Sequence, residues 1–268
     1  MAKTIGIIAI KGGVGKTTVA SSLAVDLANT YGKKVLLIDA NYSAPNLGMH
    51  MGILAPQKTI HDILIGKAKI HNAIHKKFGV DVIPGSFVFE KRINPFKLSD
   101  RIKKIKDEYD FVILDSSPSL NEEVLSTMLA SDYLFVVTTP DYPTLYCSLR
   151  AAKLALQRGK PISGIILNKT SDPRFELSLK EIEEASRIPV VAKVPFDNNC
   201  KKALFYKMPI QVYDKKSKFS KEITRLGAAL ALKKENGFSW KKLLGLDFNR
   251  EEVNRQFLKD SFYTGVFR

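Results

Sequence analysis

The sequence has only two cysteines, Cys147 and Cys200, which lie far apart and outside any Cys-x-x-Cys motif. This excludes a disulfide scaffold and favours a reducing compartment. No apolar run approaches the ~18 residues that a transmembrane helix requires. The short apolar run at the N-terminus ends in a glycine loop rather than a signal-peptide cleavage site. We therefore expect a cytoplasmic protein, and attachment to the inner surface of the cell membrane stays open.

Internal repeats, low-complexity segments and linkers rich in glycine, serine or proline are also missing from the 268 residues. Hydrophobic residues make up 45% and charged residues 26% of the chain. These values are close to the averages of globular proteins, so a disordered or collagen-like chain is excluded. Negative charge is scarce, and the net charge is +15. The excess favours an anionic partner, which is a nucleic acid, a lipid surface or a phosphate ligand.

Short apolar, β-branched runs alternate with longer amphipathic segments along the chain. Runs that are apolar on both faces and separated by helices indicate a parallel sheet covered on both sides. The predicted fold is therefore α/β, a mostly parallel twisted sheet with helices on both faces. The predicted strands are Thr4–Ile10, Val35–Asp39, Val80–Ile83, Phe111–Asp115, Tyr133–Thr139, Ile162–Asn168 and Val190–Val194. The predicted helices lie near 16–31, 58–66, 98–107, 121–131, 143–158, 176–186, 198–206 and 216–235.

The same alternation predicts the domain organisation. We expect residues 1–235 to form one α/β domain and residues 236–268 to form a short helical C-terminal appendage. In parallel α/β sheets, ligands bind at the carboxyl ends of the strands. Functional residues should therefore follow strands, and the unusual residues of this chain do so.

The strongest motif follows the first predicted strand and opens a predicted helix; it reads Lys11-Gly12-Gly13-Val14-Gly15-Lys16-Thr17-Thr18. This strand–loop–helix context is what a phosphate-binding P-loop requires. The glycines let backbone N–H groups converge on phosphate oxygens, and the helix N-terminus adds a partial positive charge. In such a loop Lys16 reaches the β and γ phosphates, and the Thr17 hydroxyl is suited to ligate Mg²⁺.

The loop departs from the common P-loop pattern, because Ile10 replaces its first glycine and Lys11 adds a second lysine. In this form it resembles the deviant Walker A motif of the MinD/ParA family of ATPases, and MinD-like proteins of archaeal type in particular. The resemblance implies ATP and Mg²⁺ as cofactors and an unidentified protein that stimulates hydrolysis. It also implies an ATP-dependent homodimer in which Lys11 contacts the phosphates of the partner subunit's ATP. Such a lysine neutralises charge in the transition state, as an arginine finger does.

The segment from Asp39 to Gly48 follows the second predicted strand and resembles the first switch region of MinD proteins, an Asp-x-Asp followed by Asn-Leu. The resemblance implies that Asp39 holds Mg²⁺ through water and that position 41 orients the attacking water. This chain has Asn41 there instead of aspartate. An amide can still position a water but cannot accept its proton. Because positioning counts for more in a loose phosphoryl-transfer transition state, we predict slow hydrolysis.

Three later segments also follow predicted strands and resemble family motifs. Asp115 ends an apolar strand and resembles the Walker B aspartate, which implies a place in the Mg²⁺ shell. The segment from Ser116 to Leu120, which includes Ser119, resembles the second switch in its ParA form, whose backbone N–H groups sense the γ-phosphate. Two weaker resemblances imply residues that line the adenine base: the pair Asn168-Lys169 and the loop Pro195-Phe196-Asp197.

Two lysine-rich segments carry much of the positive charge. Between Lys201 and Lys221 there are seven lysines and one acidic residue, Asp214, and a second cluster spans Lys97–Lys106. Each is either a solvated basic face or a patch for DNA phosphates or anionic lipid. In our interpretation neither cluster is interleaved with base-stacking aromatic residues, so only backbone binding of nucleic acid is expected, with a strong dependence on salt.

The C-terminal appendage contains a basic amphipathic segment at 238–248. Such a segment suits an interfacial membrane helix and resembles the membrane-targeting tail of MinD proteins, although twenty residues follow it here. The alternatives are helices that pack on the body or swap onto a partner, and contact with another protein. The first apolar face is Trp240, Leu243, Leu244 and Phe248, flanked by Lys241 and Lys242. A second apolar set is Val253, Phe257, Leu258 and Phe262.

Three functions fit these motifs. The first is a MinD-like ATPase switch that positions a division or motility complex, with reversible membrane attachment through 238–248. The second is a ParA-like ATPase that segregates DNA and binds it non-specifically. The third is a carrier of a metal centre, which requires paired cysteines that Cys147 and Cys200 do not supply in sequence. The first switch and the tail favour the first function, whereas the second switch and the net charge favour the second.

Overall fold

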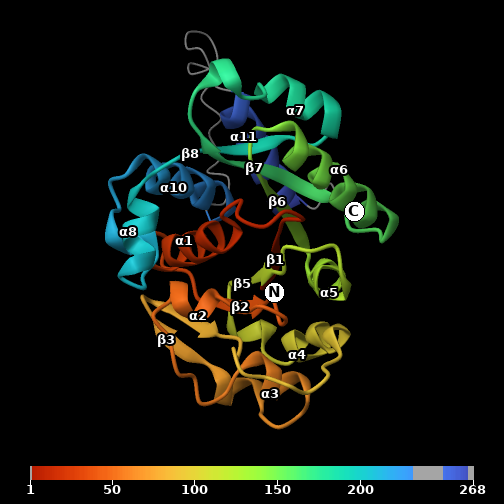
Figure 1. Cartoon of the computed structure of the whole chain (residues 1–268), viewed down its shortest axis with the longest axis vertical. Helices are drawn as coiled ribbons and strands as arrows, with labels where there is room; N and C mark the ends of the chain where they lie inside the picture. The colour runs from red at the N-terminus through yellow and green to blue at the C-terminus, as the bar shows by residue number, and fades with distance from the viewer. Residues whose placement is uncertain (1, 232–249, 265–268) are drawn as a thin grey trace.

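A central sheet organises the computed structural model, which describes residues 2–231 and 250–264. Within these residues the sheet has eight strands in the order β3-β4-β2-β5-β1-β6-β7-β8 (Figure 1). All neighbouring strands pair in parallel except β3, which pairs antiparallel with β4 at the edge. The strands are β1 (Lys3–Ile8), β2 (Val35–Ala40), β3 (His75–Lys77), β4 (Val80–Ile83), β5 (Phe111–Ser116), β6 (Tyr133–Thr138), β7 (Ile162–Thr170) and β8 (Val190–Pro195). The predicted mostly parallel sheet is confirmed, and β3 is a strand that the sequence pattern did not reveal.

Helices connect the strands, and several begin with the side-chain caps that their sequences supply. The Asn121 side chain accepts hydrogen bonds from two backbone N–H groups at the start of α5, and the Asp141 side chain caps α6 by accepting one from the Thr144 backbone N–H. The α-helices are α1 (Lys16–Asn29), α2 (Leu47–His50), α3 (Ile60–Leu64), α4 (Leu98–Lys103), α5 (Glu122–Ala130), α6 (Tyr142–Gln157), α7 (Leu179–Ser186), α8 (Asn199–Phe205), α9 (Ile210–Tyr213), α10 (Lys218–Ala231) and α11 (Arg250–Thr264). Four 3₁₀ turns accompany them among the described residues: η1 (Ile70–Ala73), η2 (Pro95–Lys97), η3 (Lys106–Glu108) and η4 (Pro173–Phe175).

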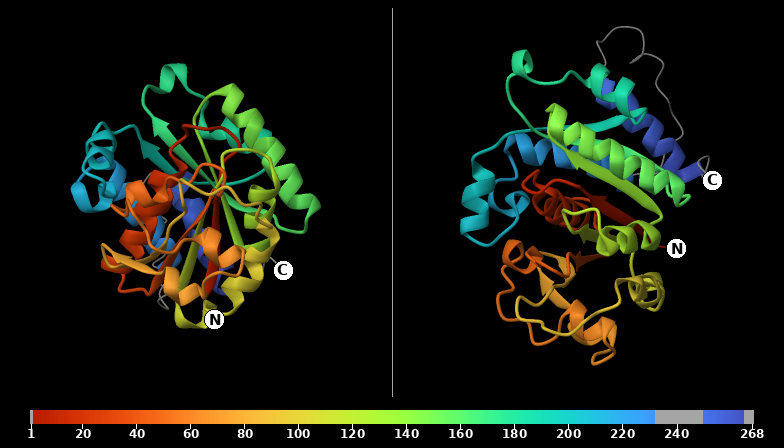
Figure 2. Two further views of the ribbon diagram at one scale, coloured as in Figure 1. Left: turned by 60° about the horizontal axis from the view of Figure 1, so that its bottom comes forward. Right: turned by 45° about the vertical axis from the view of Figure 1, so that its right-hand side comes forward.

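The strands are apolar on both faces because helices cover both sides of the sheet (Figure 2). On one side Ile7, Leu37 and Val191 pack with buried residues of α1, α10 and α11. On the other side Leu36 and Leu134 belong to clusters built with α3, α4, α5 and α6. Successive strand residues point to opposite faces, so each strand contributes to both cores. The first strand–helix turn lies at the carboxyl ends of the parallel strands, because β1 leads directly into it.

Helix α11 packs on the body beside β8 and α10. Leu258 and Phe262 are buried in the same core as α1, and the Phe262 ring lies 4.0 Å from the ring of Tyr133, measured between centroids. Arg255 is 7% exposed and pairs with the buried Glu222 of α10 at 2.6 Å. Of the second apolar set, Val253 and Phe257 are exposed. The amphipathic segment 238–248 lies outside the described residues. No described helix is long and apolar enough to cross a membrane.

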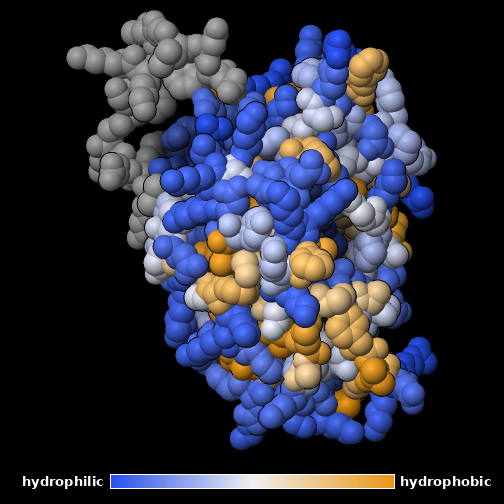
Figure 3. All heavy atoms as spheres, turned by 60° about the vertical axis from the view of Figure 1, so that its left-hand side comes forward, coloured by the Kyte–Doolittle hydropathy of each residue, from blue (hydrophilic) through white to orange (hydrophobic). Residues whose placement is uncertain are grey.

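The lysine-rich segment 201–221 spans α8, α9 and the start of α10, and here one interpretation was wrong. Aromatic side chains do interleave with the lysines: Phe205, Tyr206 and Tyr213 are exposed, and the rings of Tyr206 and Tyr213 stack at 5.7 Å. Helices of seven and four residues are too short to bury both faces, so their outer side chains remain in solvent. Apolar residues lie among hydrophilic ones on this side of the molecule (Figure 3).

Candidate nucleotide-binding site

The loop between β1 and α1 has the backbone that a P-loop needs. Gly13 and Gly15 adopt φ angles of 80° and 90°, a region that side chains with a Cβ rarely enter. A Cβ on Gly15 would also lie 2.3 Å from the Asn168 amide nitrogen. That nitrogen donates to the Val14 carbonyl at 2.7 Å, and Lys169 Nζ donates to the Gly13 carbonyl at 2.6 Å. The end of β7 therefore braces the loop directly.

A cavity of about 350 Å³ opens above this loop and gathers segments that are far apart in the sequence. Of the predicted residues, its lining includes Lys11 to Thr18, Asn41, Asn168, Lys169, Pro195, Phe196 and Asp197. Three predicted residues lie outside the lining. Asp39 and Asp115 are fully buried beneath it, and Ser119 is exposed, whereas its neighbour Pro118 reaches the cavity.

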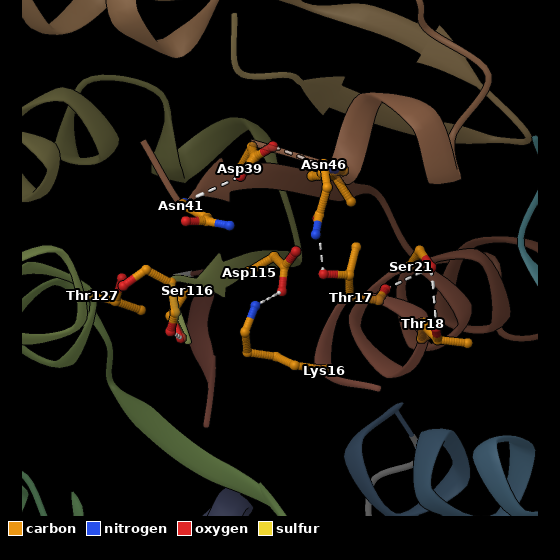
Figure 4. Close-up of polar contacts among 12 residues, drawn as sticks. Lys16, Thr17, Thr18, Ser21, Asp39, Asn41, Asn46, Asp115, Ser116 and Thr127 are labelled. Carbon is orange, nitrogen blue, oxygen red and sulfur yellow. Dashed lines mark hydrogen bonds and ion pairs between the residues drawn. The ribbon is translucent and has the colours of Figure 1, made fainter. Parts of the chain in front are cut away.

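Lys16 and Thr17 point from the start of α1 toward the ends of the neighbouring strands (Figure 4). Lys16 Nζ donates to Asp115 Oδ1 at 2.6 Å, and both side chains are buried. The Thr17 hydroxyl donates to Asn46 Oδ1 at 3.0 Å. The P-loop, the end of β5 and the segment after β2 thus meet at one point. Phosphate oxygens bound here would compete with Asp115 for the Lys16 ammonium group.

The two aspartates beneath the loop occupy paired positions on β2 and β5. Burial, and then the neighbouring Asp115 charge, raise the pKa of Asp39 to about 7, although two backbone N–H groups oppose the shift. Asp115 Oδ2 is buried and accepts no hydrogen bond. Two carboxylates and a threonine hydroxyl are the hard oxygen donors that Mg²⁺ prefers. These residues fit Mg²⁺, which when bound would neutralise the paired carboxylates and the phosphates.

With this geometry in place, comparisons with known proteins identify the family. Residues 2–150 match the AAA domain family. An uncharacterized ATP-binding protein of Methanocaldococcus jannaschii is 35% identical over 224 residues, which cover 82% of this chain and 85% of that protein. The solved structure of the cell division ATPase MinD of Pyrococcus furiosus is similar with a TM-score of 0.80 at 31% identity, covering 85% of this chain and 97% of that one. The chain belongs to the MinD/ParA family of P-loop ATPases.

A second solved structure of this family bears on the cofactor. The septum site-determining protein MinD of Pyrococcus horikoshii, complexed with Mg-ADP, is similar with a TM-score of 0.80 at 29% identity, covering 85% of this chain and 95% of that one. That protein binds a nucleotide with Mg²⁺ on the same fold. The resemblance in the P-loop and the fold predicted from the sequence are both confirmed.

Asn41, which stands where the MinD/ParA pattern has an aspartate, lies inside the cavity. The residue is 4% exposed. Its side-chain nitrogen donates to the Ala44 carbonyl at 2.5 Å, and its backbone N–H donates to Asp39 at 3.1 Å. An aspartate at this position could not donate to Ala44. The asparagine therefore helps to hold the turn that follows β2.

Lys11, the additional lysine of the MinD/ParA-type loop, contacts residues at the start of α6. Lys11 is about half exposed, and its Nζ donates to the Thr144 hydroxyl at 3.1 Å and lies 3.7 Å from Asp141 Oδ1. Although partial burial opposes it, hydrogen bonds from Thr139 and Thr144 hold the pKa of Asp141 below its usual value. Lys11 thus rests on a carboxylate at the N-terminus of α6, within its own subunit.

Several cavity residues escaped the motif analysis. Asn46 belongs to the first-switch segment but received no role, although its side chain contacts Thr17. His50 lies one helical turn further along α2 and also lines the cavity. Burial lowers the pKa of His50, Lys16 adds to this effect and Asp115 opposes it. The sequence did offer a signal for His50: it lies four residues after Asn46, a spacing that places both residues on one face of a helix.

Proposed function

We propose that this protein is an ATP-dependent molecular switch that dimerises with ATP, hydrolyses it slowly and positions a cellular complex, as MinD-like proteins do. The observation that carries the proposal is the convergence at one cavity of the braced P-loop, the buried Lys16–Asp115 pair and the half-exposed Lys11. Replacement of Lys16 with alanine tests the first step. We expect loss of nucleotide binding, measured with a fluorescent ATP analogue.

The side chains assign roles in this proposed cycle. Backbone N–H groups of the loop and the Lys16 ammonium group bind the phosphates. Thr17, Asp39 and Asp115 would hold Mg²⁺, and Asn41 would orient the attacking water from inside the cavity. Asn168 and Lys169 brace the loop, while Pro195, Phe196 and Asp197 contribute the wall suited to the base. Ser119 contributes through its backbone in the exposed turn before α5.

Dimerisation is the proposed output of ATP binding. Of the two lysines of the loop, Lys16 is buried and Lys11 reaches solvent. Lys11 lines the cavity and contacts Asp141 at the N-terminus of α6. In the dimer, the Lys11 side chain would leave Asp141 and contact the phosphates of the partner subunit's ATP. Its ammonium group would thus exchange one anionic partner for another. ATP would thereby link two subunits and complete each site.

We propose residues 1–235 as the ATPase domain and residues 236–268 as a C-terminal appendage. In the appendage, α11 is anchored on the body, and residues 238–248 are proposed to attach reversibly to an anionic membrane. Two such segments in one dimer raise avidity by ~10²–10⁴ when the geometry allows both to engage. The protein would then move between the cytoplasm and the inner face of the membrane as ATP is bound and hydrolysed.

Co-sedimentation with anionic liposomes in Mg-ATP and in Mg-ADP tests this attachment. We expect pelleting with ATP alone, and its loss when Leu243 and Leu244 are both replaced with glutamate. The matched control is the double variant Val253→Glu, Phe257→Glu on the exposed face of α11, because it adds the same two negative charges outside 238–248. Equal pelleting of the Leu243→Glu, Leu244→Glu variant and the wild type contradicts the attachment.

A second candidate, a ParA-like DNA-segregation ATPase, is supported by the lysines of 201–221. All seven are exposed, and none forms a salt bridge among the described residues. Duplex binding in Mg-ATP should fall steeply with salt and weaken about tenfold in a Lys215→Glu, Lys216→Glu double variant. Lys103→Glu with Lys104→Glu is the control in the other basic cluster.

The remote third candidate, a metal-centre carrier, has less support. Cys147 lies on α6 and Cys200 on α8, and both are free thiols. Burial raises the pKa of Cys200 to about 12, which disfavours the thiolate form that binds metals.

A further inference from the structure

A second cavity of about 420 Å³ lies outside the nucleotide site. It opens to solvent and is lined by the segment after β2, the start of α5 and the loop that precedes η2, and it shares no lining residue with the nucleotide cavity. Its walls include Ser43, Glu123 and Phe89. No step of the proposed ATPase cycle uses these three side chains.

Glu123 gives this cavity an unsatisfied acceptor. The side chain is 7% exposed, and its Oε1 accepts hydrogen bonds from the Ser43 backbone N–H at 3.0 Å and from the Ser43 hydroxyl. Its other oxygen, Oε2, is buried and accepts none. A buried carboxylate oxygen without a donor is destabilising, and a charged donor relieves this most strongly. The vacant lone pairs therefore fit a cationic hydrogen-bond donor.

An aromatic wall beside Glu123, formed by the half-buried Phe89 ring with the buried His61 behind it, fits the stem of a basic side chain. The rings of His61 and Phe89 lie 4.5 Å apart, measured between centroids. His61 Nδ1 accepts from the Ser86 backbone N–H at 3.1 Å, and its Nε2 lies 3.0 Å from the Tyr42 carbonyl, so the ring links the loop to the segment after β2. Burial lowers the pKa of His61, in keeping with a neutral ring. Neutral aromatic faces suit a guanidinium group and its methylenes.

The loop that precedes η2 indicates what kind of molecule carries the basic group. Its residues Phe87 and Val88 are 53% and 84% exposed, which offers apolar contact area to a protein surface. Lys91 and Arg92 also line the cavity and repel a uniformly basic partner. We propose that this cavity receives one basic side chain, arginine by preference, from an acidic segment of a partner protein.

Occupation of this cavity would act on the first switch region. Ser43 lies two residues after Asn41 and three before Asn46, and Glu123 holds it through two hydrogen bonds. A guanidinium group on Oε2 shares the carboxylate with Ser43 and changes how firmly the segment 41–46 is held. This coupling rests on the proposed ATPase function, whereas the binding itself does not.

Peptide titration of the full-length protein without nucleotide tests the binding. The probe is acetyl-Glu-Arg-Glu-amide, and its comparator replaces arginine with citrulline, which has the same shape but no charge. We expect saturable binding of the arginine peptide, followed by NMR or calorimetry, and at least tenfold weaker binding of the citrulline peptide. Equal binding of the two peptides, or no saturable binding of the arginine peptide, overturns the proposal.

Variants locate the site. Glu123→Gln should weaken the arginine peptide at least tenfold, while Glu90→Gln, on an exposed residue of the same loop outside the lining, should stay within twofold. Retention of full affinity by Glu123→Gln overturns the assignment. If that variant does not fold, the citrulline comparison on the wild type carries the test.

The coupling has its own readout, the rate of ATP hydrolysis with and without saturating arginine peptide. We expect a change of at least threefold in the wild type and a smaller change in Ser43→Ala, which lacks the hydroxyl contact to Glu123. Binding without any change in rate overturns the coupling. A wild type that binds the peptide but hydrolyses no ATP overturns the proposed function and leaves the cavity assignment standing.

Discussion

Asp39 on β2 and Asp115 on β5 face each other in paired register, and both side chains are completely buried. The pKa of Asp39 is raised by burial and by Asp115 from 3.8 to about 7. A carboxyl group whose pKa is higher in the folded state stabilises the fold at low pH. That contribution is lost as the pH rises from about 4 through about 7, because the unfolded chain then holds fewer protons than the folded one.

Asp39→Asn should therefore remove this loss of stability with rising pH in buffer without Mg²⁺ or nucleotide, although its amide can accept only one of the two backbone N–H groups that Asp39 binds. We expect the variant to gain about 1–3 kcal/mol over the wild type between pH 5 and pH 8, because it lacks the cost of ionising a buried carboxyl. Urea unfolding at both pH values measures this, with the exposed Asp100→Asn as control. Parallel pH profiles of variant and wild type would refute the prediction. The same variant should lose the dependence of nucleotide affinity on Mg²⁺.

The contact between Lys11 and α6 predicts how dimerisation responds to mutation. Lys11→Ala should keep nucleotide affinity within about threefold but lose the ATP-dependent dimer. Asp141→Asn keeps a capping side chain for α6 and removes the charge beside Lys11. We expect this variant to dimerise at a severalfold lower protein concentration. Light scattering with a non-hydrolysable ATP analogue measures both, and an unchanged dimerisation midpoint in Asp141→Asn would show that the contact does not restrain Lys11.

Asn41→Asp tests the predicted slow hydrolysis. The carboxylate supplies a proton acceptor inside the cavity and gives up the hydrogen bond to Ala44, so it is freer to face the attacking water. General-base assistance contributes about 10²-fold or more where it operates, and positioning limits the gain here, so we expect about tenfold faster steady-state ATP hydrolysis. Ser43→Ala, in the same segment, is the control for loosening alone. A rate that does not rise contradicts the prediction.

Arg255 anchors α11 through a buried ion pair with Glu222 and a hydrogen bond to the Val191 carbonyl at 3.1 Å. In Arg255→Met, Glu222 keeps the exposed Arg225 as an ion-pair partner at 3.1 Å, so the cost falls below the ~3–5 kcal/mol of an unpaired buried charge, to about 1–3 kcal/mol. Arg255→Met should destabilise the protein by an amount of this order in urea unfolding. The double variant with Glu222→Met should recover part of the loss. Arg250→Met removes a half-exposed arginine of the same helix and should cost far less.

Local patterns were sufficient to predict most of the fold. The strand runs of β2, β4 and β5 were placed within a residue because a strand buried on both faces needs an uninterrupted apolar sequence. The P-loop was equally readable, since its glycines and lysines act through the backbone and helix end that they themselves form. The edge strand β3, with the sequence His-Lys-Lys, was not predictable, because its only support is the pairing with β4.

The sequence by itself determined the P-loop, the alternation of strands and helices and the family. Only the tertiary structure decided which distant residues meet: Lys16 with Asp115, Lys11 with Thr144, Ser43 with Glu123, and Arg255 with Glu222. These contacts join residues from 33 to 133 positions apart. They depend on strand order and helix packing, which are determined by burial of apolar residues over the whole core. The local sequence around each of these residues therefore does not indicate its partner.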